Sequence, residues 1–345
     1  MLSTAKIFEY TASPIIYKPR DNRLPILSLT APGLVGSVIA MNIKNVAIAV
    51  NMVPGNSSNP DRPGMNSSIL ARHIPHVSNT SLEAAENIRK TQRGVSWLYI
   101  VGDGKDQTSF VAETGMKKDN FNPLNYTKES LKKKSLLPSL SFLNFYQDKG
   151  HDEGLVFRWS DYKYPLVFQA FNEGLFNDYG KISEPSYFYD NLGFINKSYN
   201  EENCPRSYYF PPQREDKDDV ILMTNHFISP SMRLTSMNPW TVMLTKKRHD
   251  ESQWRYDEVN KLLLDNYGNI DEKKAIEILD LLSPYGKFPN YYLDMKAETT
   301  YNSSDGRTRL IRGSLALCDL TDGIMHIHVG FYADHWINVS LLNYF

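Results

Sequence analysis

Residues 34–53, LVGSVIAMNIKNVAIAVNMV, decide the fold of this chain. Small and β-branched residues fill positions 34–41 and again 46–53, a composition typical of two buried strands. Between them stands the tetrapeptide NIKN at 42–45, and its last residue, Asn45, can adopt the left-handed backbone conformation that a tight turn requires. The stretch therefore predicts a β-hairpin.

Further helical and extended segments follow the hairpin. Thr80 and Glu83 have the spacing of a capping box, which predicts the start of a helix that ends before Gly94. Residues 97–101 and 109–113 predict two strands joined by a glycine-containing turn. A hairpin, a helix and a second hairpin in succession predict an α+β fold built in layers.

Aromatic residues gather in the middle of the chain, where 21 of the 42 Phe, Trp and Tyr residues fall between positions 121 and 210. Disordered chains are poor in aromatic residues, so this segment is not a flexible linker. It predicts an inserted subdomain or a lid, and its aromatic side chains either line an acyl pocket or pack an irregular insertion. We expect residues 1–115 and 220–345 to form the two parts of the layered domain, with 116–219 as the insertion.

The last third of the chain returns to regular patterns. A short strand, two helices and a final hairpin are expected over 220–224, 252–266, 272–282, 309–318 and 324–330. The short strand ends in the tripeptide Thr224-Asn225-His226, and Asp271 is placed to cap the second helix.

Composition excludes several classes of function. Hydrophobic residues make up 41% of the chain and charged residues 22%, which are globular values. The net charge of −1 from 38 basic and 39 acidic residues indicates neither a nucleic acid nor an anionic membrane as partner. The longest uncharged stretch, 25–43, is broken by proline and glycine, so no membrane span is predicted. The two cysteines, Cys204 and Cys318, are too few for a disulfide framework.

No metal or cofactor site is predicted. His73 and His76 could share a helix face, but Pro75 between them argues against a regular helix. His326 and His328 alternate with apolar residues and point to one face of a strand, which favours a surface or interlayer pair over a metal site.

Five motifs, taken in order, resemble the acyl-coenzyme A:6-aminopenicillanic acid acyltransferase (isopenicillin-N acyltransferase-like) family of cysteine Ntn hydrolases. They are the first hairpin, Leu82-Glu83-Ala84-Ala85, Thr224-Asn225-His226, the segment ESQWRY at 251–256 and the final hairpin at 308–330. Asn45 stands where the family usually has glycine. The resemblance covers most of the chain and is loose over 116–219.

The resemblance implies an αββα four-layer sandwich and a precursor that cleaves itself to expose an N-terminal cysteine. The α-amino group of that cysteine serves as the general base for its thiol. Acyl transfer then passes through a thioester, and an oxyanion hole holds the tetrahedral intermediate.

The resemblance also implies which residues of this chain form the site, wherever a motif of the family matches. The asparagine of the Thr-Asn-His motif, here Asn225, is expected to donate to the oxyanion from its side-chain amide, and a backbone N–H near Asn51 and Met52 is expected to be the second donor. A guanidinium beside the nucleophile falls on Arg309, with Arg312 as second choice.

The family's nucleophilic cysteine would lie just upstream of Met1, and the family's first strands with it. The printed chain is therefore expected to be a fragment, a product of a mispredicted start, or a degenerate homologue. Two functions follow as hypotheses: an amide hydrolase or acyltransferase that is complete only with upstream sequence, and an inactive binding protein of the same fold. The expected partners are a small amide or acyl substrate, such as an acyl-CoA donor, and an upstream segment or α chain of the same precursor. Seven glycosylation sequons give a weak preference for a secreted or lumenal protein.

Overall fold

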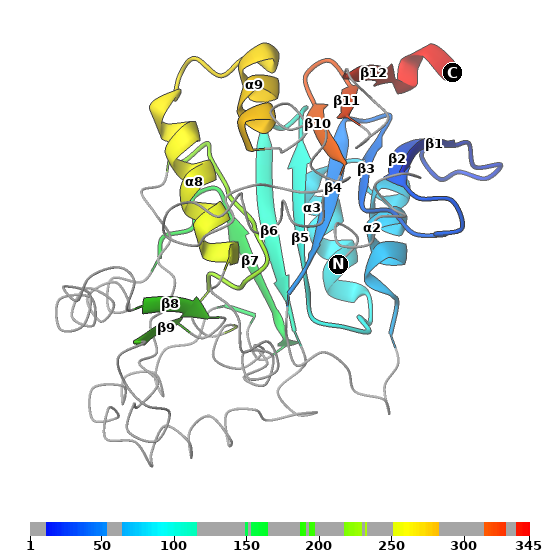
Figure 1. Ribbon diagram of the computed structural model, residues 1–345. Helices are drawn as coiled ribbons and strands as arrows, with labels where there is room; N and C mark the ends of the chain where they lie inside the picture. The colour runs from blue at the N-terminus through cyan, green and yellow to red at the C-terminus, as the bar shows by residue number, and fades with distance from the viewer. Residues whose placement is uncertain are drawn as a thin grey trace.

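The computed structural model describes residues 12–53, 64–115, 149–150, 153–164, 187–190, 193–196, 217–229, 232, 251–282, 314–328 and 336–345 (Figure 1). The elements in chain order are β1 (Ser13–Tyr17), β2 (Ile26–Thr30), β3 (Ile39–Asn42), β4 (Val46–Met52), α2 (Ser67–Val77), α3 (Ser81–Lys90), β5 (Trp97–Asp103), β6 (Thr108–Thr114), β7 (Leu155–Trp159), β8 (Tyr187–Asp190), β9 (Gly193–Asn196), α8 (Glu251–Asp265), α9 (Glu272–Leu282), β10 (Leu315–Asp319), β11 (Ile324–His328), β12 (Ile337–Ser340) and the 3₁₀ helix η6 (Leu341–Tyr344).

The main sheet has seven strands that pair in sequence order, β1 to β7, and every pairing is antiparallel. The predicted first hairpin is confirmed as β3 and β4, but its first strand begins at Ile39 instead of residue 34. The preceding strand, β2, was not predicted. Gly36, which precedes β3, packs so closely against α2 that a Cβ there would lie 2.5 Å from the backbone of Ser68. β7 comes from within 116–219 and pairs with β6, so this part of the range belongs to the sheet.

The turn of the first hairpin is fixed by two asparagines. Asn45 has a φ of 61°, the left-handed conformation expected of it. The buried Asn42 side chain uses all its hydrogen-bonding capacity. Its amide nitrogen donates to the carbonyls of Pro75 and Ser78 at 2.8 and 2.7 Å, and its oxygen accepts from the backbone N–H groups of Lys44 and Val46. The hairpin is thereby tied to the end of α2.

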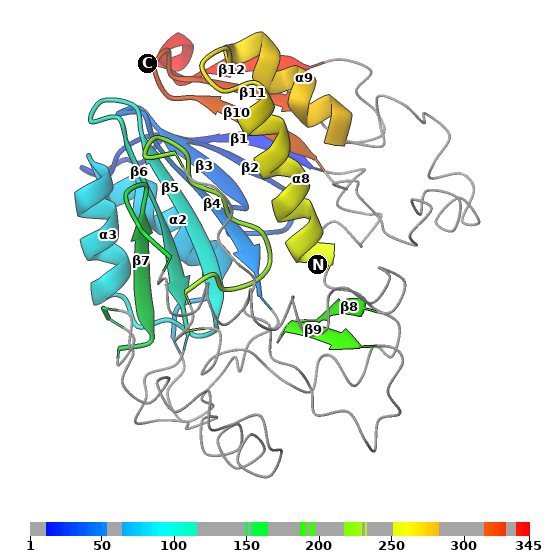
Figure 2. The same ribbon diagram turned by 90° about the vertical axis from the view of Figure 1, so that its left-hand side faces the viewer.

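Helices α2 and α3 cover one face of the main sheet (Figure 2). Apolar residues of both helices pack against that face of the sheet, among them Leu70, Ala71, Ile74, Ala84, Ala85 and Ile88. The expectation that Pro75 would prevent a helix was wrong, because it lies in the last turn of α2, close to where the helix ends. His76 Nδ1 lies 2.7 Å from the Leu24 carbonyl, so this imidazole joins two parts of the backbone.

The capping box of α3 is present in a modified form. Thr80 Oγ1 accepts from the Glu83 N–H at 3.2 Å, while the Glu83 carboxylate accepts from the N–H of Asn79, one residue earlier than in the usual box. Leu82 points outward with 67% of its surface exposed, whereas Ala84 is fully buried.

A second sheet, β10-β11-β12, lies on the opposite face of the main sheet. Residues of β2, β3 and β4 form a common core with residues of the second sheet, namely Leu27, Leu29, Met41, Ala47, Met325 and Ile327, joined by Leu341 of η6. Helix α9 lies against β10 on the outer side. The described elements therefore stack as helix, sheet, sheet and helix, and the expected α+β class with an αββα arrangement is confirmed (Figures 1 and 2).

The predicted helices α8 and α9 are confirmed, and the Asp271 side chain caps α9 by accepting from the N–H of Lys274 at 2.7 Å. Within the residues described, no helix is both long enough and apolar enough to cross a membrane.

Asn42→Ala should lower the free energy of unfolding by about 3 kcal/mol, because buried backbone donors and acceptors would lose their partners. Equilibrium unfolding in urea measures the loss. Asn79→Ala is a matched control, since its amide bonds to Glu83 on the exposed surface and should cost less than about 1 kcal/mol. Equal losses for the two variants would show that Asn42 does not hold the hairpin.

Candidate functional site

One row of side chains crosses four strands of the main sheet. The register pairs Asn51 of β4 with Leu98 of β5, Leu98 with Glu113 of β6, and Glu113 with Val156 of β7. Neighbouring residues along each strand point to opposite faces. Because Val50, Tyr99, Ala112 and Leu155 face the helices, the row lies on the face away from α2 and α3.

Residues 217–229 lie over this row. Phe227 is buried and packs in one cluster with Leu98 and Val156. The strand expected at 220–224 is not formed, and side chains of the sheet bind two of the carbonyls in this range. Arg158 Nη2 donates to the Leu222 carbonyl at 3.1 Å, and Asn51 Nδ2 donates to the Thr224 carbonyl at 3.2 Å.

Asn51 and Asn225 form a reciprocal pair. While Asn51 donates to the Thr224 carbonyl, Asn225 Nδ2 donates to the carbonyl of Met52 at 2.7 Å. Two segments that are 173 residues apart in the sequence are thus joined by two side-chain-to-backbone bonds. The structure brings together the three site residues Asn51, Met52 and Asn225, all of them partly buried.

A buried carboxylate holds the other end of the segment. Glu113 is fully buried, and its Oε1 accepts from Arg158 Nε at 2.6 Å and from the Ile228 N–H at 2.9 Å. Its Oε2 accepts from the Ser229 N–H at 3.0 Å and from the Ser229 hydroxyl. The Arg158 side chain is 3% exposed, so the ion pair is shielded from solvent. Buried charges need such partners.

His226 lies between the sheet and helix α8. Its Nδ1 is 3.2 Å from Thr224 Oγ1, and its buried ring meets the ring of Tyr256 edge to face at 5.9 Å between centroids. The Thr-Asn-His motif is therefore bound on one side to β4 and on the other to α8.

Glu113 and Arg158 were missed in the sequence, although a signal was present. In FVAET at 110–114, Glu113 lies two positions after the apolar Val111, so in a strand the two side chains would point to the same face. In VFR at 156–158, Arg158 has the same relation to Val156. A charged residue at the inward phase of an apolar strand is rarely buried without a partner. Two such residues of opposite sign predict a buried pair.

The remaining candidates do not join this group. Arg309 and Arg312 lie outside the described residues, and so does Cys204. Cys318 belongs to the core between the two sheets, where burial raises the pKa of its thiol to about 12. Such a thiol is hardly ionised at neutral pH and is a poor nucleophile.

Comparison with known proteins gives distant similarities. No family model matches the sequence. An uncharacterized protein of Archaeoglobus fulgidus is 27% identical over 325 residues, which cover 94% of this chain and 38% of that protein. The chain thus spans well under half the length of the curated relative that it matches.

Similar solved structures include two variants of the conjugated bile acid hydrolase from Clostridium perfringens. One has a TM-score of 0.44 and 10% identity, covering 97% of this chain and 87% of that one. The other has a TM-score of 0.42 and 9% identity, covering 97% and 86%. An N-acylethanolamine-hydrolyzing acid amidase ortholog from Caenorhabditis elegans has a TM-score of 0.25 and 11% identity, covering 32% and 50%.

Removing one member of the buried pair should be costly. Glu113→Ala leaves Arg158 as a buried unpaired cation, and we expect the free energy of unfolding to fall by about 3–5 kcal/mol. In a double-mutant cycle with Arg158→Met, the double variant should lose less than the sum of the single losses. Asp218→Asn is the control, because its 2.8 Å pair with Lys163 is exposed and should contribute less than about 1 kcal/mol. Additive losses in the cycle would contradict the coupling.

Cys318 should resist thiol reagents in the folded protein. In a Cys204→Ala variant, only Cys318 remains, and with a pKa of about 12 its thiolate fraction at pH 8 is roughly 10⁻⁴. We expect negligible reaction with a disulfide reagent over minutes at pH 8 and complete reaction after unfolding in urea. Rapid labelling of the folded variant would mean that the thiol is accessible and ionised.

Proposed function

We propose that this chain is part of a cysteine amide hydrolase or acyltransferase of the Ntn type, similar to the isopenicillin-N acyltransferase-like family. The observation that supports the proposal best is the reciprocal contact between the end of β4 and Thr224-Asn225. These are the two places at which the resemblance puts the oxyanion donors, and they come from distant parts of the sequence. A turn residue with no role beyond its turn would not need this contact.

The geometry suits stabilisation of a negative oxygen. An amide side chain carries two N–H donors, and the backbone carbonyl of Met52 accepts from one of those on Asn225 Nδ2. The contact holds the carboxamide in one orientation, so little reorganisation is needed when charge develops on the substrate oxygen. Asn225 would be the side-chain donor of the oxyanion hole, and a backbone N–H near Asn51 and Met52 the second donor.

The reaction would proceed in two steps. A cysteine thiol attacks the carbonyl carbon of an amide and its proton passes to the α-amino group of the same cysteine, which then protonates the departing amine. The resulting thioester is cleaved by water in a hydrolase or by a second amine in an acyltransferase. Arg309, or Arg312 as second choice, would favour the thiolate through its positive charge.

The proposal places the nucleophile outside the 345 residues, in an upstream segment of the same precursor that is cleaved to expose it. The burial of Cys318 leaves that cysteine unsuited to the role. The burial of Cys318 is equally compatible with the second candidate, an inactive binding protein that keeps the sandwich. Reading the coding DNA upstream of Met1 distinguishes the two: an in-frame cysteine followed about 18 residues later by Asp-Phe or Asp-Trp supports the enzyme, and a stop codon without such a segment supports the binding protein.

The enzyme is tested directly by joining residues 1–345 to their own upstream coding sequence. Intact-mass spectrometry with a panel of N-acyl amides should reveal an acyl adduct that is lost after treatment with hydroxylamine, as expected of a thioester. The absence of both an adduct and turnover with every amide in the panel, despite an upstream cysteine, would overturn the proposal.

Asn225→Ala in that longer protein should reduce the turnover number by roughly 10² to 10³, because one donor to the developing oxyanion is lost. The Michaelis constant should change little, and the free energy of unfolding should fall by only about 1 kcal/mol. Asn266→Ala is the matched control, since it removes a comparable 2.8 Å bond to the Leu262 carbonyl at the end of α8. Full activity of Asn225→Ala would mean that Thr224-Asn225-His226 is only a structural turn.

A further inference from the structure

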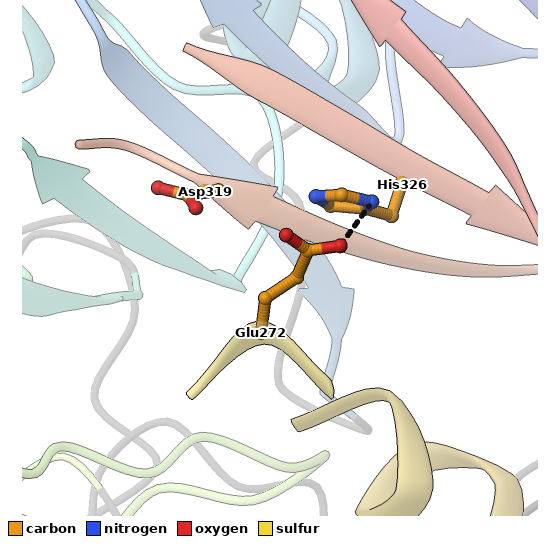
Figure 3. A group of neighbouring side chains, drawn as sticks. All are labelled: Glu272, Asp319 and His326. Carbon is orange, nitrogen blue, oxygen red and sulfur yellow. Dashed lines mark ion pairs between the residues drawn. The ribbon is translucent and has the colours of Figure 1, made fainter. Parts of the chain in front are cut away.

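A group of three ionisable side chains lies apart from the row on the main sheet. Glu272 begins helix α9, Asp319 ends β10 and His326 lies in β11. One possible ligand atom from each lies within 4.8 Å of the other two (Figure 3). The group therefore spans the boundary between the second sheet and its covering helix.

The register of the second sheet explains why these residues meet. His326 pairs with Leu317 and Asn338, and Asp319 pairs with Ile324 two positions away. Paired residues share a face, so Asp319 and His326 point to the same side of the sheet. Met325 and Ile327 take the other side, toward the main sheet, which leaves His326 on the side of α9.

The contacts of Nδ1 indicate the tautomer of the His326 imidazole. His326 Nδ1 lies 2.9 Å from Asn338 Oδ1 and 3.4 Å from Glu272 Oε1, and both of these oxygens are acceptors. Nδ1 therefore carries a proton, and in the neutral ring Nε2 presents its lone pair. This is the arrangement of most metal-binding histidines, in which one ring nitrogen donates to an oxygen and the other faces the ion.

The second nitrogen is buried without a partner among the described residues. The His326 side chain is 1% exposed, and its Nε2 has no hydrogen bond within the part of the chain that the structure describes. Figure 3 shows that this nitrogen lies on the edge of the ring that faces Asp319 and Glu272. A buried polar atom left without a partner is costly, so its aim toward two carboxylates requires an explanation.

We propose that Glu272, Asp319 and His326 bind a divalent cation of the Zn²⁺ or Mn²⁺ class. One imidazole nitrogen and two carboxylate oxygens suit these ions better than Ca²⁺ or Mg²⁺, which prefer oxygen alone. The two carboxylates balance the charge of the ion. Asp319 Oδ1 accepts from the N–H groups of Thr321 and Asp322, which holds this ligand in place.

The site can close around an ion with one side-chain movement. Ligand atoms around Zn²⁺ at about 2.1 Å lie roughly 3–4 Å apart, and those of the group lie within 4.8 Å of one another. Glu272 is 47% exposed at the start of α9, so its side chain can rotate inward, whereas His326 is held by Asn338. The bound ion would join α9 to β10 and β11, and water would fill its remaining coordination positions.

Titration of the full chain, after treatment with EDTA, with zinc chloride and with manganese chloride tests the site. Isothermal calorimetry should show one ion bound per chain with a dissociation constant in the micromolar range or below. The midpoint of thermal unfolding should rise by a few degrees at saturation, because the ion binds only the folded state. Glu272→Gln, which changes an exposed side chain, should weaken binding at least tenfold, and His326→Gln should abolish it.

The matched control is His328→Gln, a second buried histidine on the same strand, whose ring contacts Trp336 at 5.7 Å. This variant should bind the ion as the unchanged protein does. Circular dichroism establishes that each variant is folded. The proposal is overturned if neither ion binds saturably below about 1 mM, or if Glu272→Gln binds with unchanged affinity.

Discussion

The charge of Glu113 is the constraint on which the candidate site depends. A carboxylate buried on β6 must be matched by charge and by hydrogen-bond donors, since its desolvation costs several kcal/mol. Arg158 supplies the charge, and residues 228–229 supply the remaining donors. The bonds of Glu113 to residues 228 and 229 therefore hold segment 217–229 over this face of the sheet.

This constraint also places the amide of Asn225. Residues 228–229 are held at β6, and Phe227 packs against Leu98 of β5 and Val156 of β7. Three residues before Ile228, at Asn225, the chain reaches the end of β4. There the bonds of Asn51 and Asn225 to opposite backbones leave the carboxamide with one orientation. Under the proposed function, the Asn225 amide would act as an oxyanion donor that is oriented before the reaction. Its orientation would then depend on the charge pair between Glu113 of β6 and Arg158 of β7.

The sequence predicted the elements whose pattern is local and missed those fixed by distant contacts. The runs of small and β-branched residues in β3 and β4, the apolar segments of β5 and β6, and the caps of α3 and α9 were sufficient. α2 was missed because Pro75 cannot donate a backbone hydrogen bond and therefore argued against a helix, whereas in the structure it lies in the last turn, so most of the helix precedes it. The strand at 220–224 was predicted from its apolar residues, but its carbonyls bind Arg158 and Asn51, and no local pattern reveals such partners. The register that joins Asn51 to Glu113 could be drawn only once the strand order was known.

Strand β4 connects the packing of the two sheets to the candidate site. Its residues on the face away from α2 and α3 are Ala47, Ala49 and Asn51, and the adjoining Val53 packs with Phe227. Ala47 lies in the core shared with the second sheet, where a small side chain allows the sheets to approach closely. Two cores thus meet along one strand, and Asn51 stands between them. A larger residue at Ala47 would push the second sheet outward and, through the same strand, shift the backbone to which Asn225 is bound.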